Sequence, residues 1–234
     1  TIDATNAADV SWNGQITGND IYGSGYADTI STGPRYARVD AGGGNDTINL
    51  NSGANSQADI YYSTGDGSDI INGFHTRAAH LANARANGPD EFRMDFSSTT
   101  NDTTWVTLDG TNVNNGIFGA GVIGGSSVLY FAGNLNVGEA PVTAGQLFTA
   151  LEIALPGGDG NGSFFGAPAG QDQLFVLTDT STGNSYVIEY EDTVPDGGVN
   201  GISVLHTSEL RLVASFVDAD LGRGDILDHA GNFI

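Results

Sequence analysis

The chain has 234 residues, of which 35 are glycine and none is cysteine, and its formal net charge is −21. Because a strongly acidic surface repels phosphate groups, this charge excludes nucleic acid and anionic membranes as expected partners and points to cations. The absence of cysteine excludes disulfide cross-links, thiol catalysis and cysteine-ligated metals.

The first segment, residues 1–16, is expected to form a strand or cap through Val10–Gly14. The sequence has no apolar run near 20 residues and no N-terminal signal peptide, so no transmembrane segment is expected. Since the chain starts at Thr1 rather than at methionine, we expect it to be a fragment of a longer protein.

Three glycine-rich turns dominate residues 17–74. Each turn is closed by an aspartate, and an isoleucine follows two residues later, in the segments Tyr22–Ile30, Ala41–Ile48 and Thr64–Ile71. The three aspartates are Asp28, Asp46 and Asp69, so the intervals between them are 18 and 23 residues. Ordinary turn chemistry accounts for one such turn, but three with the same tail indicate a repeat.

These residue types suit calcium, which binds six to eight oxygens, several of them backbone carbonyls at sharp glycine turns. Carboxylates add the negative charge that a divalent cation needs. The predicted ligand residues of the turns are Gly23, Gly25, Asp28, Gly42, Gly44, Asp46, Gly65, Gly67 and Asp69.

The turns resemble the G-G-x-G-x-D-x-U-x nonapeptide of calcium-binding RTX (repeats-in-toxin) proteins. The resemblance implies a parallel β-roll in which two nonapeptides form one coil and ions lie between stacked turns. Two calcium sites are then expected, between 23–28 and 42–46 and between 42–46 and 64–69. The longer second interval keeps the register if 51–57 carries about five extra residues, and the three isoleucines then stack inside the roll.

The opposite edge of the roll is expected to be mostly free of metal. There Asn19 and Asp20 form a degenerate repeat in which Asp20 is a partial ligand, whereas Pro34 and Arg35 disrupt the next turn. Two interpretations stay open for Asp40 and Asp59: each is either a ligand or a solvated strand or turn residue.

The roll is expected to end in two segments that resemble the last RTX repeat, 68–74 and 88–98. The alanine-rich stretch between them, 75–87, is predicted to be an inserted helix. A zinc site at His75 and His80 is not expected, because a spacing of five places them off a common helical face and no H-E-x-x-H motif is present.

The second half is predicted to be β-rich with one main helix. Strands are indicated by β-branched and aromatic content at 105–108, 128–131, 173–177, 185–190 and 209–213. A hairpin turn is expected at 178–184, and a helix at 143–155 begins at Thr143 and is ended by Pro156.

Two acidic loops in this half have two interpretations each. The loop 156–162, with Asp159, and the loop 218–225 either bind an ion or are flexible glycine loops. The second lacks the glutamate at position 12 of an EF-hand loop, so an EF-hand is excluded.

Residues 140–234 also resemble the C-terminal regions of RTX and S-layer proteins, which carry a type I secretion signal. The expected fold is therefore mainly β, with a β-roll unit at 1–98 followed by a β-rich unit at 99–234.

The resemblance implies a secreted, extracellular protein without enzymatic activity, whose Ca²⁺-dependent folding serves a structural or assembly role, as in an S-layer subunit or adhesin. Self-assembly and cell-surface polysaccharide are the expected partners besides calcium. Two alternatives stay open: the carrier domain of a secreted protease or polysaccharide-modifying enzyme, and a glycan-binding β-domain at 99–234.

Overall fold

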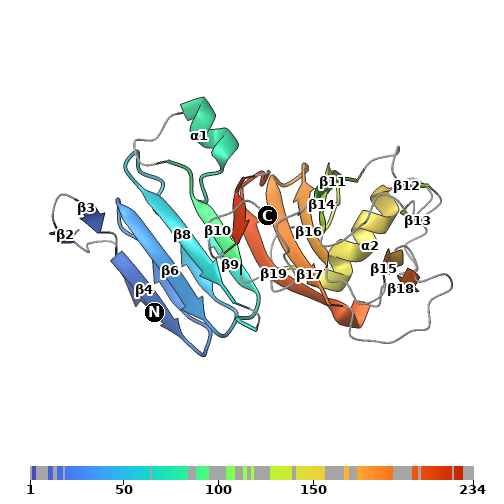
Figure 1. Ribbon diagram of the computed structural model, residues 1–234, viewed down its shortest axis with the longest axis horizontal. Coiled ribbons are helices and arrows are strands. Elements are labelled where there is room, and N and C mark those ends of the chain that lie inside the picture. Colours follow the sequence, from blue (N-terminus) through green and yellow to red (C-terminus); the bar gives the residue numbers. More distant parts are fainter. Residues whose placement is uncertain are drawn as a thin grey trace. The chain divides into compact units, whose positions relative to one another are not determined.

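The computed structural model is mainly β and divides into two compact units, residues 1–96 with 214–234 and residues 97–213 (Figure 1). The described residues are 2–3, 10–12, 15–17, 19–63, 65–83, 88–94, 104–108, 113–114, 117–118, 127–138, 141–155, 166–168, 173–191, 202–204, 207–222 and 224–228.

In the first unit the chain alternates between two sheets of parallel strands. One sheet has the order β20-β10-β8-β6-β4, with bounds Ile226–Asp228, Glu91–Met94, Gln57–Tyr62, Tyr36–Gly42 and Asn19–Ser24. The other places β1 (Ile2–Asp3), β5 (Thr29–Ser31), β7 (Thr47–Asn49), β9 (Asp69–Asn72) and the last four residues of β19 (Leu210–Val217) side by side. A short antiparallel pair, β2 (Val10–Trp12) and β3 (Gln15–Thr17), lies in the segment expected to form a strand or cap.

The pairing register shows where the extra residues of the second interval are accommodated. Paired residues are 18 apart between β4 and β6, as in Asn19 and Ala37, but 21 apart between β6 and β8, as in Ala37 and Ala58. They are 23 apart between β7 and β9. Three of the five extra residues therefore lie before β8, in or near the predicted 51–57 segment, and two lie between β8 and β9.

The predicted isoleucine stack is present: Ile30, Ile48 and Ile71 are cross-strand partners and are fully buried. Phe216 of β19 continues this row, because it pairs with Ile71 and packs edge-to-face on Phe74 with 5.0 Å between ring centroids. Burial of this narrow apolar row holds the two sheets of the first unit together.

The links at the other ends of these strands are held by hydrogen bonds from the backbone to side chains. Thr32 Oγ1 accepts from Asn51 N at 2.9 Å, and the carboxylate of Asp90 accepts from Ala58 N and His75 N, each at 2.7 Å. The predicted insertion contains helix α1, Arg77–Asn83, as expected.

The second unit packs one helix on a sheet. The strands are β11 (Thr104–Thr107), β14 (Ser127–Gly133), β16 (Gln173–Asp179), β17 (Asn184–Tyr190) and the first half of β19, which follows the 3₁₀ turn Thr207–Glu209. Shorter strands form two pairs, β12 (Val113–Asn114) with β13 (Ile117–Phe118) and β15 (Gly166–Pro168) with β18 (Ile202–Val204). The predicted strands and the β16–β17 hairpin are confirmed.

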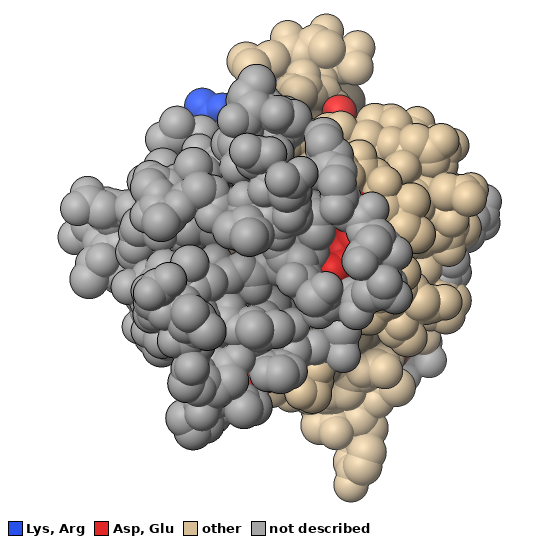
Figure 2. Space-filling model, turned by 90° about the vertical axis from the view of Figure 1, so that its right-hand side faces the viewer, with Lys and Arg blue, Asp and Glu red and all other residues tan. Residues whose placement is uncertain are grey.

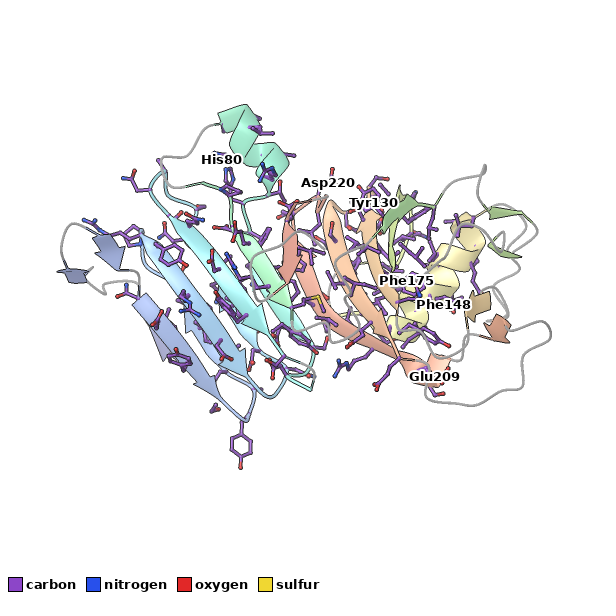
Figure 3. All side chains as sticks on the ribbon, in the orientation of Figure 1. His80, Tyr130, Phe148, Phe175, Glu209 and Asp220 are labelled. Atoms are coloured by element: carbon purple, nitrogen blue, oxygen red, sulfur yellow. The ribbon has the colours of Figure 1, made fainter. Side chains whose placement is uncertain are left out.

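Helix α2, Ala144–Ala154, confirms the predicted helix together with its start, because Thr143 and Gln146 form a capping box. Its Phe148 points toward Phe175 of β16 (Figure 3), with ring centroids 6.4 Å apart. The part of the surface described in Figure 2 consists largely of residues that are neither acidic nor basic.

The division of the chain differs from the expected boundary at 98/99, since residues 214–234 belong to the first unit. The strand predicted at 209–213 continues to Val217, and its last four residues pair with β9. None of the described helices is long and apolar enough to cross a membrane.

Candidate functional site: the stacked aspartate turns

The three predicted turns lie at one edge of the first unit, since each connects a strand of the β4 sheet to a strand of the β5 sheet. Parallel, in-register pairing stacks them in chain order. In the first turn, Gly23 lies in β4, and Gly25 and Asp28 lie between β4 and β5. In the second, Gly42 is the last residue of β6, and Gly44 and Asp46 lie between β6 and β7. In the third, Gly65 and Gly67 lie between β8 and β9, and Asp69 is the first residue of β9.

The three aspartates form a ladder across the turns. Asp28 N donates to Asp46 Oδ1 at 2.7 Å, and Asp46 N donates to Asp69 Oδ1 at 3.0 Å. Backbone bonds run alongside, from Thr47 N to Asp28 O and from Ile70 N to Asp46 O. Each of the two inner carboxylates is thus fixed to the preceding turn by one oxygen.

Burial destabilises the charged forms of the two inner carboxylates, those of Asp46 and Asp69. Asp46 and Asp69 are 1% and 3% exposed. Desolvation raises the pKa of Asp46, and it raises the pKa of Asp69 to about 7, with the charges of neighbouring carboxylates adding to both effects. Asp46 Oδ2 is buried and has no hydrogen-bond partner among the described residues. A cation at this position would compensate that charge.

Asp28, in the outermost of the three turns, is in a different environment. It is partly exposed, and its Oδ2 accepts hydrogen bonds from Ser24 Oγ at 2.8 Å and from Ser24 N at 2.9 Å. These bonds lower the pKa of Asp28. This carboxylate is therefore ionised without the help of a metal.

Glycine allows the turns to approach each other closely. A Cβ on Gly67, whose φ is +110°, would lie 1.8 Å from the carbonyl oxygen of Gly44. A Cβ on Gly44, whose φ is +122°, would lie 2.6 Å from Ala27 N. Side chains at these positions would push neighbouring turns apart, and backbone oxygens of adjacent turns could no longer share one ion.

Two turn residues that the motif did not single out also belong to this region. The charge of Asp66 contributes to the raised pKa values of both Asp46 and Asp69. Asn45 Oδ1 accepts from Ser68 N at 3.1 Å, so this bond joins the second turn to the third. The sequence signal for Asp66 is its position between Gly65 and Gly67 in the third predicted calcium turn, where only the two glycines and Asp69 are predicted ligands.

The other acidic candidates of the repeat region lie in strands. Asp20 is in β4, and its carboxylate is 4.0 Å from Arg38. Asp40 Oδ1 accepts from Gly42 N at 3.2 Å, and Asp59 Oδ2 accepts from the Tyr36 hydroxyl at 2.8 Å. Asp40 therefore contacts the second turn through Gly42, whereas these contacts of Asp20 and Asp59 lie outside the stacked turns.

The remaining predicted loops differ in what the structure describes. Asp225 is buried and accepts from Arg77 N at 2.6 Å and from Gly222 N at 2.8 Å, so backbone N–H groups occupy both oxygens of its carboxylate. The rings of His75 and His80 are in edge-to-face contact, 6.1 Å apart. The predicted loop 156–162 lies outside the described residues.

Side chains alone do not build a metal site here, because nowhere in the described ranges do three His, Asp or Glu side chains gather closely enough to hold an ion. The stacked turns instead offer carboxylates beside glycine backbone, which is the mixed oxygen set that calcium accepts. No protein-family model matches the chain, and the comparisons with curated proteins and with solved structures found no match either.

Proposed function

We propose that the first unit is a calcium-binding parallel β-roll and that the chain is an extracellular, non-enzymatic structural or assembly module that folds on calcium after secretion. The observation that carries the proposal is Asp46. Its Oδ1 bonds to the turn before it, its N–H bonds to the turn after it, and its Oδ2 is buried without a hydrogen-bond partner among the described residues.

The proposed ligands are the carboxylates of Asp28, Asp46 and Asp69 and the backbone carbonyls of the glycine turns. Calcium would supply the positive charge that the buried carboxylates lack. Because the turns form the site only when they are stacked, the free energy of binding becomes free energy of folding. At a calcium concentration a hundredfold above Kd, each site adds about 2.7 kcal/mol to the stability.

Three features support the extracellular assignment within this proposal. Extracellular calcium modules bind at roughly 10⁻⁴ to 10⁻³ M, far above cytosolic free calcium. The net charge of −21 makes the calcium-free compact state self-repulsive. A chain without cysteine relies on bonds other than disulfides for its stability outside the cell.

The test is calorimetric titration of the full chain with calcium. Two sites are expected for the natural sequence. Asp46→Asn should weaken both sites at least tenfold, because Asp46 lies in the shared middle turn, whereas Asp28→Asn should weaken mainly one. Asp20→Asn is the matched control, because Asp20 lies in β4 beside Arg38 and outside the three turns, and it should leave both sites unchanged. Equal losses for Asp28→Asn and Asp46→Asn would contradict the stacked arrangement.

A further inference from the structure

The two sheets of the first unit carry different residues on their outward faces. On β5, β7 and β9 the outward positions hold small polar residues and one isoleucine: Thr29, Ser31, Thr47, Asn49, Ile70 and Asn72. On β4, β6, β8 and β10 most of them hold tyrosine, arginine, aspartate or glutamate, and the others are Ser24, Gly42 and Gln57. Both faces belong to parallel strands of one unit (Figure 1), so strand formation does not require the difference.

We call the second set the tyrosine–arginine face. One cross-strand row on it is Asp20, Arg38, Asp59 and Glu91. The next row is Tyr22, Asp40, Tyr61 and Arg93. Tyrosine and arginine are among the residues enriched at recognition surfaces, whereas serine and threonine are under-represented among the residues that dominate binding.

The centre of the face is fixed by its own contacts. Asp59 is 5% exposed, accepts from the Tyr36 hydroxyl, and lies 3.3 Å from the Arg93 guanidinium. The Tyr61 ring has the Arg38 guanidinium 4.6 Å and the Arg93 guanidinium 5.7 Å from its centroid. The contact with Tyr61 holds the Arg38 guanidinium in place, which reduces the side-chain entropy that Arg38 would lose on binding a ligand.

The accessible groups lie at the β4 and β6 side. The Tyr22 side chain is 66% exposed, and the side chains of Asp20 and Arg38 are about half exposed and form only a loose pair at 4.0 Å. A ligand meets there an open aromatic ring next to one hydrogen-bond acceptor and one donor. A hydroxyl group can bond to both, because it donates and accepts.

Size and charge select the occupant. Four strands about 4.8 Å apart, with outward positions that extend over about 20 Å from Tyr36 to Gly42, give a face of roughly 15 by 20 Å, which is still well below the roughly 800 Å² per partner of a stable protein interface. The two rows contain four carboxylates and two guanidinium groups on a chain of net charge −21, which disfavours an anionic ligand.

We propose that the tyrosine–arginine face binds a short neutral oligosaccharide, with the Tyr22 ring against a sugar ring and with Asp20 and Arg38 bonded to its hydroxyls. This goes beyond the proposed calcium function and requires only that the first unit is folded. It places the glycan site on the first unit, not on residues 99–234, where the sequence had suggested one.

The test is calorimetric titration of the full chain, in saturating calcium, with neutral hexasaccharides of glucose, xylose, mannose and N-acetylglucosamine. At least one is expected to bind, and Tyr22→Ala and Arg38→Ala should each weaken it about tenfold or more. Thr29→Ala, on the exposed part of the other face, is the matched control and should change the affinity less than twofold.

Four results would overturn the proposal: no hexasaccharide with a Kd below about 10 mM, an equal effect of Tyr22→Ala and Thr29→Ala, tighter binding of a hexauronate than of any neutral sugar, or self-association of the chain that Tyr22→Ala abolishes. The last result would mean that the face contacts a second copy of the chain. Circular dichroism of each variant in calcium shows that the fold is kept, as expected for exposed positions.

Discussion

Gly67 is the residue at which two of the stacked turns approach most closely, because a Cβ there would lie 1.8 Å from Gly44 O. We expect Gly67→Ala to separate the second and third turns and to weaken the calcium site between them by tenfold or more. Gly65→Ala is the matched control: Gly65 lies in the same turn with a similar φ of +102°, and a Cβ on it has no atom within 4 Å. Calcium calorimetry of both variants is the measurement, and similar affinities would contradict close stacking of the turns.

Protonation of Asp69 should partly replace calcium. Its pKa rises from an ordinary value of 3.8 to about 7 in the folded unit, a change that corresponds to at most roughly 4 kcal/mol. The pKa of Asp69 is higher in the folded chain than in the unfolded chain, so the folded state binds the proton more tightly. The contribution of this proton to the free energy of unfolding is complete below about pH 4 and is lost as the pH rises towards 7. In chelator, the first unit should therefore be more folded at pH 5 than at pH 8.

The control for this prediction is Asp69→Asn, which resembles the protonated acid at every pH. It should make the chelator-treated protein more folded at pH 8 and reduce the pH dependence, while weakening calcium binding. Far-UV circular dichroism at the two pH values is the readout. A natural chain that loses β structure on acidification from pH 8 to pH 5 would show that the sign is reversed.

At the scale of elements, β19 completes the first unit although it is far away in sequence. Phe216 is fully buried and packs on Phe74 and Phe92 at 5.0 and 5.2 Å. Phe216→Ala should lower the free energy of unfolding by about 3–5 kcal/mol. It should also weaken calcium binding, because Phe216 pairs with Ile71 of β9, the strand that begins at Asp69. Amide exchange of residues 69–72 and calcium calorimetry measure the two effects.

The matched control is Phe175→Ala, a substitution of the same size in the core of the second unit, where Phe175 is 1% exposed. It should increase the amide exchange of the β16–β17 hairpin and change the calcium affinity by less than about twofold relative to the natural chain. If Phe216→Ala and Phe175→Ala have the same effect on calcium affinity, the assignment of 214–217 to the calcium-binding unit is contradicted.

The same elements show what the sequence could predict. Asp28, Asp46, Asp69 and their isoleucines were placed correctly on one edge and in one row, because repeat spacing sets the register of parallel strands. The start of α2 at Thr143 and the β16–β17 hairpin were predicted correctly because capping and turn signals are local.

The pairing of β19 with β9 and of β20 with β10 was not predicted, since the composition of a strand carries no information on which strand is its partner. The hydrogen-bonding roles of Asp90 and Asp225 were also missed. Both carboxylates bond to backbone N–H groups that are distant in sequence, Ala58 and Arg77, and only the folded chain brings these groups together. The interpretation of Asp20 as a partial ligand rested on a repeat motif, whereas its position in β4 places it beside Arg38.

At the scale of the whole molecule, the two units should differ in their need for calcium. The first holds the buried carboxylates of Asp46 and Asp69, the proposed calcium ligands, beside its stacked isoleucines, whereas the second packs its helix on its sheet through an apolar cluster that includes Leu147, Phe148, Phe175 and Tyr186. We expect burial of that cluster to stabilise the second unit without metal. Two occupied calcium sites would add about 5 kcal/mol to the first unit, comparable to the stability of a small domain.

Amide hydrogen exchange of the full chain in chelator, in magnesium and in calcium tests this account most directly. We predict that residues 19–72 are unprotected in chelator, stay so in magnesium because its octahedral geometry does not suit the carbonyl-rich turns, and become protected in calcium. Residues 173–190 should be protected in all three conditions. Protection of residues 19–72 in chelator at pH 8, or equal protection in magnesium and calcium, would contradict the account.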